Sequence, residues 1–163
     1  LYYTRFGLEK PPGLVFTMEG LIHQRFSPAQ YDRDRAYILT HEVFVAFDYG
    51  SRRLQQLLDA NDVAYLRVTL PVLVHTALYH HDADLLAETL LCMLYLGWQT
   101  TPLYCQGLHY LLDHQNPDGT WGHYEALRRP DQPYLDQQVY LHTTMVVLQA
   151  LVEAYEGHWP VSD

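Results

Sequence analysis

The stretch from Gly107 to Gly122 reads GLHYLLDHQNPDGTWG, and it predicts a helix that ends in a tight turn bearing an aromatic residue. Thr101 and Pro102 predict the start of this helix, because a hydroxyl residue caps a helix well and proline at the first helical position loses no hydrogen bond. Residues 116–119, Asn-Pro-Asp-Gly, have the composition of a tight turn. Apolar residues recur between these limits at helical spacing, namely Leu108, Leu111 and Leu112.

Gln115 stands at the end of the expected helix, and Trp121 follows the turn. We expect the glutamine amide to bond the exposed backbone of the turn, because carbonyl and amide groups at a helix end lack partners within the helix. The indole of Trp121 would pack over the same turn. Together the two side chains would fix how the chain leaves the helix.

These residues resemble the QW motif of the squalene cyclase, oxidosqualene cyclase and prenyltransferase superfamily, in which Gly-x-x-aromatic-Leu-Leu-x-x-Gln is followed by Gly-x-Trp. The resemblance implies an α/α toroid, with the string YLHTTMVVLQAL at residues 140–151 as the partner helix of the repeat. It implies little about chemistry, since such toroids also serve hydrolases, lanthionine cyclases, prenyltransferases and non-catalytic complement domains. Gln106 replaces the usual basic residue, and the motif positions are filled by Gly107, Tyr110, Leu111, Leu112, Gln115, Gly119 and Trp121.

Two upstream strings are similar to an actinobacterial family of uncharacterised toroid-like proteins. They are AYILTHEVFVAFDYG at residues 36–50 and HDADLLAETLLCMLYLG at residues 81–97. That family carries a Leu-Thr-His…Phe…Asp-x-Gly signature and an Asp-Leu-Leu-x-Glu helix. The similarity spans most of the chain and implies no activity.

The size and charge of the chain limit its organisation and its partners. A chain of 163 residues with 48% hydrophobic content predicts a single domain over residues 1–163. The chain begins at Leu1 and not at methionine, which indicates either a few trimmed residues or the C-terminal part of a longer chain. A net charge of −9 disfavours nucleic acid and anionic membranes as partners.

Cysteine usage and hydropathy predict a protein of the cytoplasm. The two cysteines, Cys92 and Cys105, do not make a disulfide framework, and Cys92 lies in an apolar run where a buried thiol is expected. No segment resembles a signal peptide, and no apolar run reaches the length of a membrane span.

Capping and breaking residues predict a succession of helices without strands. The expected helical segments are one ending near His23, one from Ser27 to Asp48, a short one from Ser51 to Asp59, one from Asn61 to His80 with Pro71 inside, one from Asp82 to Gly97, and a final one from about Pro133 to Tyr155. Short links would make these helices antiparallel hairpins. The predicted fold is therefore all-α, with α-hairpin repeats that form a partial α/α toroid.

Polar residues on the apolar inner helices of a toroid are candidates for a functional site. Tyr37, His41 and Asp48 share one face of the expected helix. Asp48 opposes the helix dipole in the last turn, which favours a tertiary partner or a functional role. We interpret His41 and Asp48 as a general acid/base pair or as ligands. The alternative is a buried histidine and aspartate that hold neighbouring backbone.

Two further candidates are His142 in the final helix and Glu88, which lies beyond the first turn of the helix from Asp82. Asp82 and Asp84 are interpreted as acids that cap this helix and complement its dipole. The string from Asp82 lacks the final aspartate of the protonating Asp-x-Asp-Asp motif of class II terpene cyclases. For His142 the alternative is a hydrogen-bonded core histidine.

The ten histidines raise the question of a metal, and the sequence identifies neither a metal nor a cofactor. No HExxH pattern occurs. A site assembled from separate helices would offer the oxygen and nitrogen ligands that suit iron, manganese or zinc. Its members would be His41, Asp48, Glu88 and His142.

Our preferred interpretation is an enzyme of specialised metabolism that performs acid/base chemistry, cyclisation or a related reaction, on a hydrophobic small molecule or peptide. The assignment to specialised metabolism follows from the resemblance alone. His41 would exchange the proton and Asp48 would orient it, with Glu88 and His142 opposite. The aromatic pocket wall would consist of Tyr37, Tyr140 and Trp121.

The alternative function is a non-catalytic protein-interaction module. It predicts a filled centre, histidines tied to the backbone, and an exposed apolar patch. The expected hairpins are also too few to close a ring. We therefore expect a homodimer, or a partner segment that completes the toroid.

Overall fold

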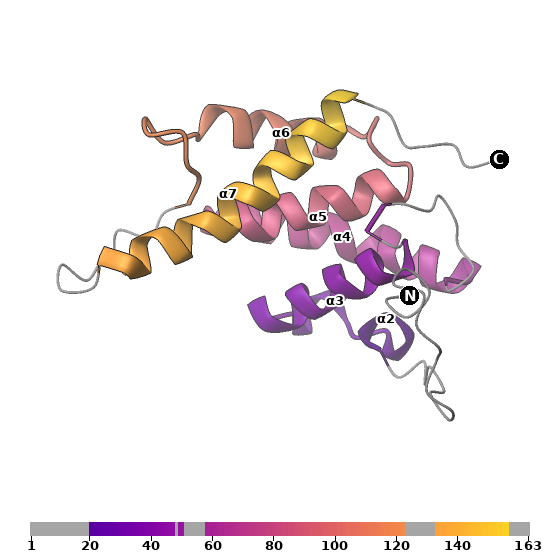
Figure 1. Ribbon diagram of the computed structural model, residues 1–163. Helices are drawn as coiled ribbons and strands as arrows, with labels where there is room; N and C mark the ends of the chain where they lie inside the picture. The colour runs from indigo at the N-terminus through magenta and orange to yellow at the C-terminus, as the bar shows by residue number, and fades with distance from the viewer. Residues whose placement is uncertain (1–19, 48, 51–57, 123–132, 157–163) are drawn as a thin grey trace, which may run out of the picture.

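The computed structural model describes residues 20–47, 49–50, 58–122 and 133–156. Within these residues every regular element is helical, which confirms the predicted all-α class (Figure 1). None of the described helices is long and apolar enough to span a membrane. The elements are α2 (Leu21–Gln24), the 3-10 helix η1 (Pro28–Gln30), α3 (Arg33–Ala46), α4 (Ala60–His80), α5 (Ala83–Tyr95), α6 (Pro102–Asp113) and α7 (Pro133–Glu156).

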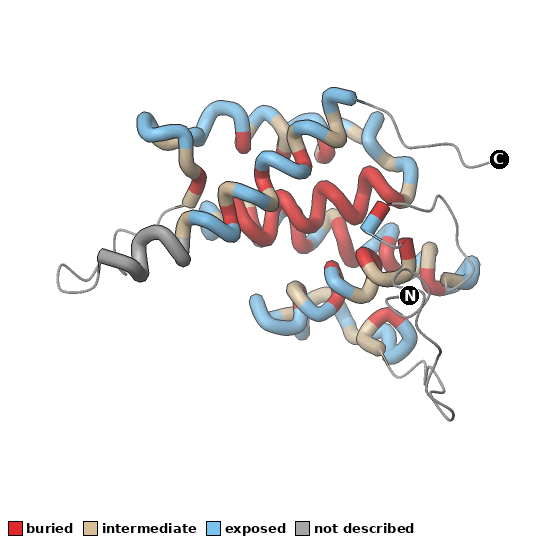
Figure 2. Tube along the Cα trace, in the orientation of Figure 1, coloured by how far each residue is buried: buried red, intermediate tan, exposed pale blue. Residues whose placement is uncertain are grey.

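Helix α5 is the core of the molecule. Each of its residues is buried, and it packs against α3, α4, α6 and α7 (Figures 1 and 2). The apolar side chains on every side of this helix are therefore removed from water, and the burial of apolar surface is the main favourable term in folding. The predicted burial of Cys92 is confirmed. The charged residues of this helix, Asp84 and Glu88, are buried with the rest.

Helices α5 and α6 begin at the predicted residues Asp82 and Thr101, whereas α4 is capped by Asp59, just before the predicted start at Asn61. Asp59 accepts hydrogen bonds from the backbone N–H groups of Asn61 and Asp62 at the start of α4. Asp82 accepts from the N–H of residue 85 at the start of α5, and Thr101 accepts from the N–H of residue 104 at the start of α6. These bonds satisfy donors that the first helical turn leaves without partners.

The predicted helix from Ser27 to Asp48 is wrong at its start. Ser27 begins only η1, and α3 starts at Arg33 after a second cap, Asp32, which accepts from the N–H of residue 35 at 2.9 Å. Two capping residues so close together divide the segment, and the later one starts the long helix. Asp48 and most of the short helix expected from Ser51 lie outside the described residues.

The turn after α6 has the contacts that its sequence predicts. The Gln115 amide donates to the carbonyl of Gly119 at 3.0 Å, and Gly119 has a φ of 86° that favours glycine. The Trp121 indole is buried and donates to the carbonyl of Leu111 at 2.6 Å. The Trp121 backbone N–H donates to the Thr144 hydroxyl at 3.1 Å, so the turn ties α6 to α7.

Candidate functional site

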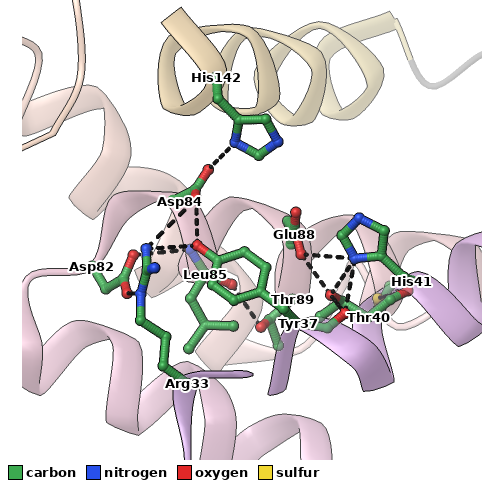
Figure 3. Close-up of polar contacts among 11 residues, drawn as sticks. Arg33, Tyr37, Thr40, His41, Asp82, Asp84, Leu85, Glu88, Thr89 and His142 are labelled. Atoms are coloured by element: carbon green, nitrogen blue, oxygen red, sulfur yellow. Dashed lines mark hydrogen bonds and ion pairs between the residues drawn. The ribbon is translucent and has the colours of Figure 1, made fainter. Parts of the chain in front are cut away.

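Two buried carboxyl groups lie one turn apart on α5, and each meets a histidine from a neighbouring helix (Figure 3). The side chains of Asp84 and Glu88 are 8% and 1% exposed, whereas His142 of α7 and His41 of α3 are 59% and 50% exposed. Burying a carboxyl group is costly unless other groups bond it. The partners of each carboxyl group therefore decide what the pair can do.

Asp84 is surrounded by donors from α3 and α7. Its Oδ1 lies 3.0 Å from Nδ1 of His142. Its Oδ2 accepts a short hydrogen bond from the Tyr37 hydroxyl and lies 3.7 Å from the guanidinium of Arg33. These groups compensate a negative charge on Asp84, and they fix His142 with Nδ1 toward the protein.

Arg33 and Tyr37 support one another beside Asp84. The guanidinium donates to the Tyr37 hydroxyl at 2.8 Å and lies over its ring at 4.7 Å from the centroid. It also pairs with Asp82, Nε to Oδ2, at 2.7 Å. Burial, reinforced by the bond to Asp84, raises the pKa of Tyr37 well above its usual range, so its hydroxyl stays a donor.

Glu88 has fewer and weaker donors than Asp84. Its Oε2 lies 2.5 Å from the Thr40 hydroxyl and 3.6 Å from Nδ1 of His41. Burial raises the pKa of Glu88 above its usual value, against the opposing effects of Thr40 and His41. The nearby charge of Asp84 raises it further. Glu88 therefore holds a proton under conditions where an exposed glutamate is ionised.

The hydroxyl of Thr40 lies between two acceptors, the Tyr37 carbonyl and the Glu88 carboxyl group. It lies 2.8 Å from the Tyr37 carbonyl oxygen, which can only accept, as well as 2.5 Å from Glu88. A hydroxyl has one proton to donate. The Tyr37 carbonyl and the Glu88 carboxyl group therefore share this one proton, which makes Thr40 a weak donor to Glu88.

Both histidines turn Nδ1 inward and leave Nε2 on the outward side. Nδ1 of His41 lies 2.8 Å from the carbonyl oxygen of Tyr37, so Nδ1 carries the proton of that bond. Nδ1 of His142 faces Asp84 in the same way. The ring of His41 also lies 5.5 Å from that of Phe44, centroid to centroid, which places an aromatic surface beside one imidazole.

The structure brings together four of the residues that the sequence singles out: Tyr37, His41, Glu88 and His142. Asp48 lies outside the described residues. Tyr140 is half-buried on α7, two residues before His142. The contacts of Trp121 with Leu111 and Thr144 hold α6 to α7, and its place in a pocket wall stays a prediction, as does that of Tyr140.

The sequence interpretation missed Arg33, Thr40 and Asp84 as members of this site. The sequence interpretation treats Asp84 as an acid that complements the helix dipole. Asp84 nevertheless precedes Glu88 by four residues, so the two side chains share one face of the helix. Arg33 likewise precedes Tyr37 by four residues on α3. Spacing could have identified both, whereas Thr40 carries no signal until its tertiary partner Glu88 is known.

A groove of about 310 Å³ lies beside this cluster, between α3, α4 and α5. Leu73 and Leu85 give it an apolar lining, with Tyr31 and His80 among its polar residues. It shares Arg33 and Asp82 with the cluster. Asp84 lies between Arg33 and His142, so the groove and His142 are on different sides of this carboxylate (Figure 3).

Metal ligands are not grouped in the described part of the chain. No set of three or more histidine, cysteine, aspartate or glutamate side chains there could hold a metal ion. The ligand set considered from the sequence includes Asp48, which is not described. Whether the four residues form a metal site therefore stays a question of the sequence analysis.

A protein-family model described as "Domain of unknown function (DUF6895)" matches residues 1–152. Neither the curated proteins nor the solved structures include a match. The chemistry of the site therefore rests on its own geometry.

Proposed function

The chain belongs to the DUF6895 family, and we propose that it is an enzyme that performs acid/base chemistry on a hydrophobic small molecule or peptide. One observation carries the proposal: the buried Asp84 carboxylate lies 3.0 Å from Nδ1 of the half-exposed His142. A carboxylate at this position holds the imidazole in one orientation and stabilises its protonated form. Nε2 of His142 is then the nitrogen that exchanges a proton with substrate.

His41 is the second proton-exchanging group, and the buried residues position the two histidines. His41 is held by the backbone carbonyl of Tyr37 and the carboxyl group of Glu88, and His142 is held by Asp84. The two carboxyl groups have different surroundings, since Asp84 meets three polar partners whereas burial raises the pKa of Glu88, and such a contrast is typical of acid/base sites. Phe44, which is buried beneath His41, packs against the imidazole and helps to fix its position.

The reaction class and the toroid are proposed from the resemblance to terpenoid-cyclase-like proteins. Cyclisation or a related proton-transfer reaction in specialised metabolism would use the two half-exposed histidines. A partial α/α toroid would have α3, α5 and α7 as neighbouring inner helices and α4 and α6 as outer ones. The packing of α5 against both α3 and α7, and of α4 against α6, supports this arrangement.

Solvent-deuterium incorporation tests the proposal without a known substrate. The protein is incubated in deuterium oxide with an organic extract of an actinobacterium, and mass spectrometry records which compounds gain mass. Proton transfer through the histidines should label or convert a compound in the presence of the parent protein. His142→Gln should reduce this conversion by about 100-fold or more, the usual contribution of a general acid or base.

His75→Gln is the matched control, since His75 is exposed on α4, outside the site. It should leave the conversion unchanged. Asp84→Asn should reduce the conversion while the fold is retained, as judged by circular dichroism. A parent protein that converts nothing in extracts of several actinobacteria, or a His142→Gln variant as active as the parent, would refute the acid/base function.

The non-catalytic interaction module remains a second candidate, because the outward side of α7 carries exposed large apolar residues. This alternative also agrees with a centre that is filled by the buried helix α5 and with the bond from His41 to a backbone carbonyl. It predicts that substitutions of the site histidines have no catalytic consequence. Changes on the outward side of α7 would instead alter association.

A further inference from the structure

Helix α7 is apolar on two opposite sides. Its inner side, with Thr143, Val147 and Ala150, is buried where α7 packs on α5. The outer side is exposed to solvent, and its large apolar residues are between 46% and 92% exposed. We call these residues the outer stripe: Leu141, Met145, Leu148, Val152 and Tyr155.

The outer stripe has the composition of a buried surface. From residue 140 to residue 152 the helix contains no aspartate, glutamate, lysine or arginine, although these make up 18% of the chain. Exposed helix faces are normally polar, and a helix that is apolar all round is normally buried. Figure 2 nevertheless shows exposed segments along α7. Exposed apolar surface of this extent is typical of an interaction site.

The spacing of the outer stripe fits another helix. Its members follow one another at intervals of four, three, four and three residues, the repeat with which two helices pack side by side. An anionic membrane surface does not fit, because residues 140–156 contain no lysine or arginine and the chain carries a net charge of −9. A helical protein partner is therefore the occupant to consider.

We propose that the outer stripe is covered by a second copy of this chain, through antiparallel pairing of two α7 helices about a two-fold axis. With the axis near residue 150, Met145 packs against Tyr155 of the second copy, and Leu148 packs against Val152 of the second copy. The same surface then serves both partners, as a two-fold interface requires.

The charges along the edge of the stripe favour this orientation. His142, Gln149 and Glu156 recur every seven residues and so lie along one edge of the stripe. In the antiparallel pair His142 faces Glu156 of the second copy, and the two Gln149 side chains face each other. A parallel, in-register pair would not bring His142 opposite Glu156. The edge is therefore complementary to itself only in the antiparallel orientation.

This pairing has a consequence for the candidate site. His142 already faces Asp84 through Nδ1, and Glu156 of the second copy would approach from its outward side. Dimerisation would then control access to the nitrogen that exchanges a proton. This consequence rests on the proposed function, whereas the dimer itself does not.

Sedimentation velocity of the parent chain at micromolar concentration tests the pairing. We expect a dimer, and we expect Leu148→Glu to raise the dissociation constant by about 100-fold or more, because it buries an uncompensated charge in the pair. Val68→Glu is the matched control, since Val68 is an exposed valine on α4 outside the stripe. It should leave the dimer intact. A parent chain that sediments as a 19.0 kDa monomer throughout would overturn the proposal.

Two further measurements separate pairing from misfolding and from other partners. If Leu148→Glu fails to fold by circular dichroism, Met145→Lys replaces it as the test within the stripe. The dissociation constant should fall when salt rises from about 20 to about 150 mM. The added salt screens the repulsion between two copies that each carry a net charge of −9.

The orientation is tested with spin labels in a background with Cys105 replaced by serine. Labels at residue 149 should lie close together in the dimer, because both are near the axis. Labels at residue 156 should be separated by about 18 Å along the helix axis, at a rise of about 1.5 Å per residue, because each lies six residues from the two-fold axis. Equal distances at the two positions would indicate a parallel pair and overturn the antiparallel proposal.

Discussion

Asp84 and Glu88 are one turn apart on the same buried helix, yet their surroundings differ. Asp84 meets a histidine, a tyrosine hydroxyl and a guanidinium. Glu88 meets the Thr40 hydroxyl and, more distantly, His41. Burial is the main cause that raises the pKa of Glu88, against the smaller opposing effects of Thr40 and His41. One helix therefore carries a carboxyl group with three polar partners and another whose pKa is raised by burial.

The raised pKa of Glu88 predicts how Glu88→Gln changes the dependence of stability on pH. The folded protein holds this proton more tightly than the unfolded chain, whose glutamate titrates at its usual value of 4.5. The free energy of unfolding of the parent should therefore fall as pH rises above 4.5, until the raised pKa of the folded state is reached. Glutamine, which imitates the protonated acid, should remove this fall, at most about 1.4 kcal/mol per pH unit.

Urea unfolding of both proteins between pH 4 and pH 8 measures this difference. The variant should gain stability relative to the parent as pH rises, and the gain should level off above the raised pKa. If the two free-energy profiles remain parallel, Glu88 does not hold an extra proton in the folded state.

Trp121 and Gln115 predict unequal losses of stability, although both belong to the same turn. The indole is buried and bonded to the Leu111 carbonyl, so Trp121→Ala should lower the free energy of unfolding by about 3–5 kcal/mol. Gln115→Ala removes one exposed bond to Gly119 and should cost about 1 kcal/mol. Chemical denaturation measures both. Equal effects would mean that the indole contributes no more than the amide bond.

At the scale of elements, α5 and α6 approach each other closely at Gly107. A Cβ atom at this position would lie 2.8 Å from a methyl carbon of Leu90 and 3.4 Å from one of Leu86. Leu90 belongs to the buried core and has little room to move. The glycine thus sets the distance between the two helices.

Gly107→Ala should destabilise the protein, even though alanine favours a helix over glycine by about 1 kcal/mol. Overpacking against Leu90 typically costs about 1–3 kcal/mol, so we expect a net loss of up to about 2 kcal/mol. Thermal or urea unfolding measures the loss.

Leu90→Ala provides the control, through a double-mutant cycle with Gly107→Ala. Removing the leucine methyl groups should make the added Cβ neutral or favourable, so the two changes should not be additive. Additive losses would show that the cost of Gly107→Ala arises elsewhere than at this contact.

At the scale of the whole molecule, the central position of α5 predicts the order in which the protein opens. All of its residues are buried and it packs against four other helices. Its amide hydrogens should exchange with solvent only through global unfolding, and more slowly than those of the short helix α2 at the edge of the bundle. Hydrogen exchange followed by NMR measures this order. Exchange in α5 as fast as in α2 would contradict its role as the core.

The sequence by itself determined the helical class, most helix boundaries and the contacts of the turn after α6. These features depend on local chemistry: caps such as Thr101, the turn glycine at residue 119, and the pair of Gln115 and Trp121. Local rules failed where two capping residues follow each other, as Ser27 and Asp32 do, because both have the chemistry of a helix start and only the second one begins the long helix.

The tertiary structure alone decided the composition of the candidate site. His41, Glu88 and His142 are far apart in the chain, and their contacts exist only because α3 and α7 pack on opposite sides of α5. The roles of Asp84 and Glu88 also follow from this packing, which supplies donors to one carboxyl group and leaves the other mainly desolvated. Spacing places residues on one helix face, but only packing determines which faces meet.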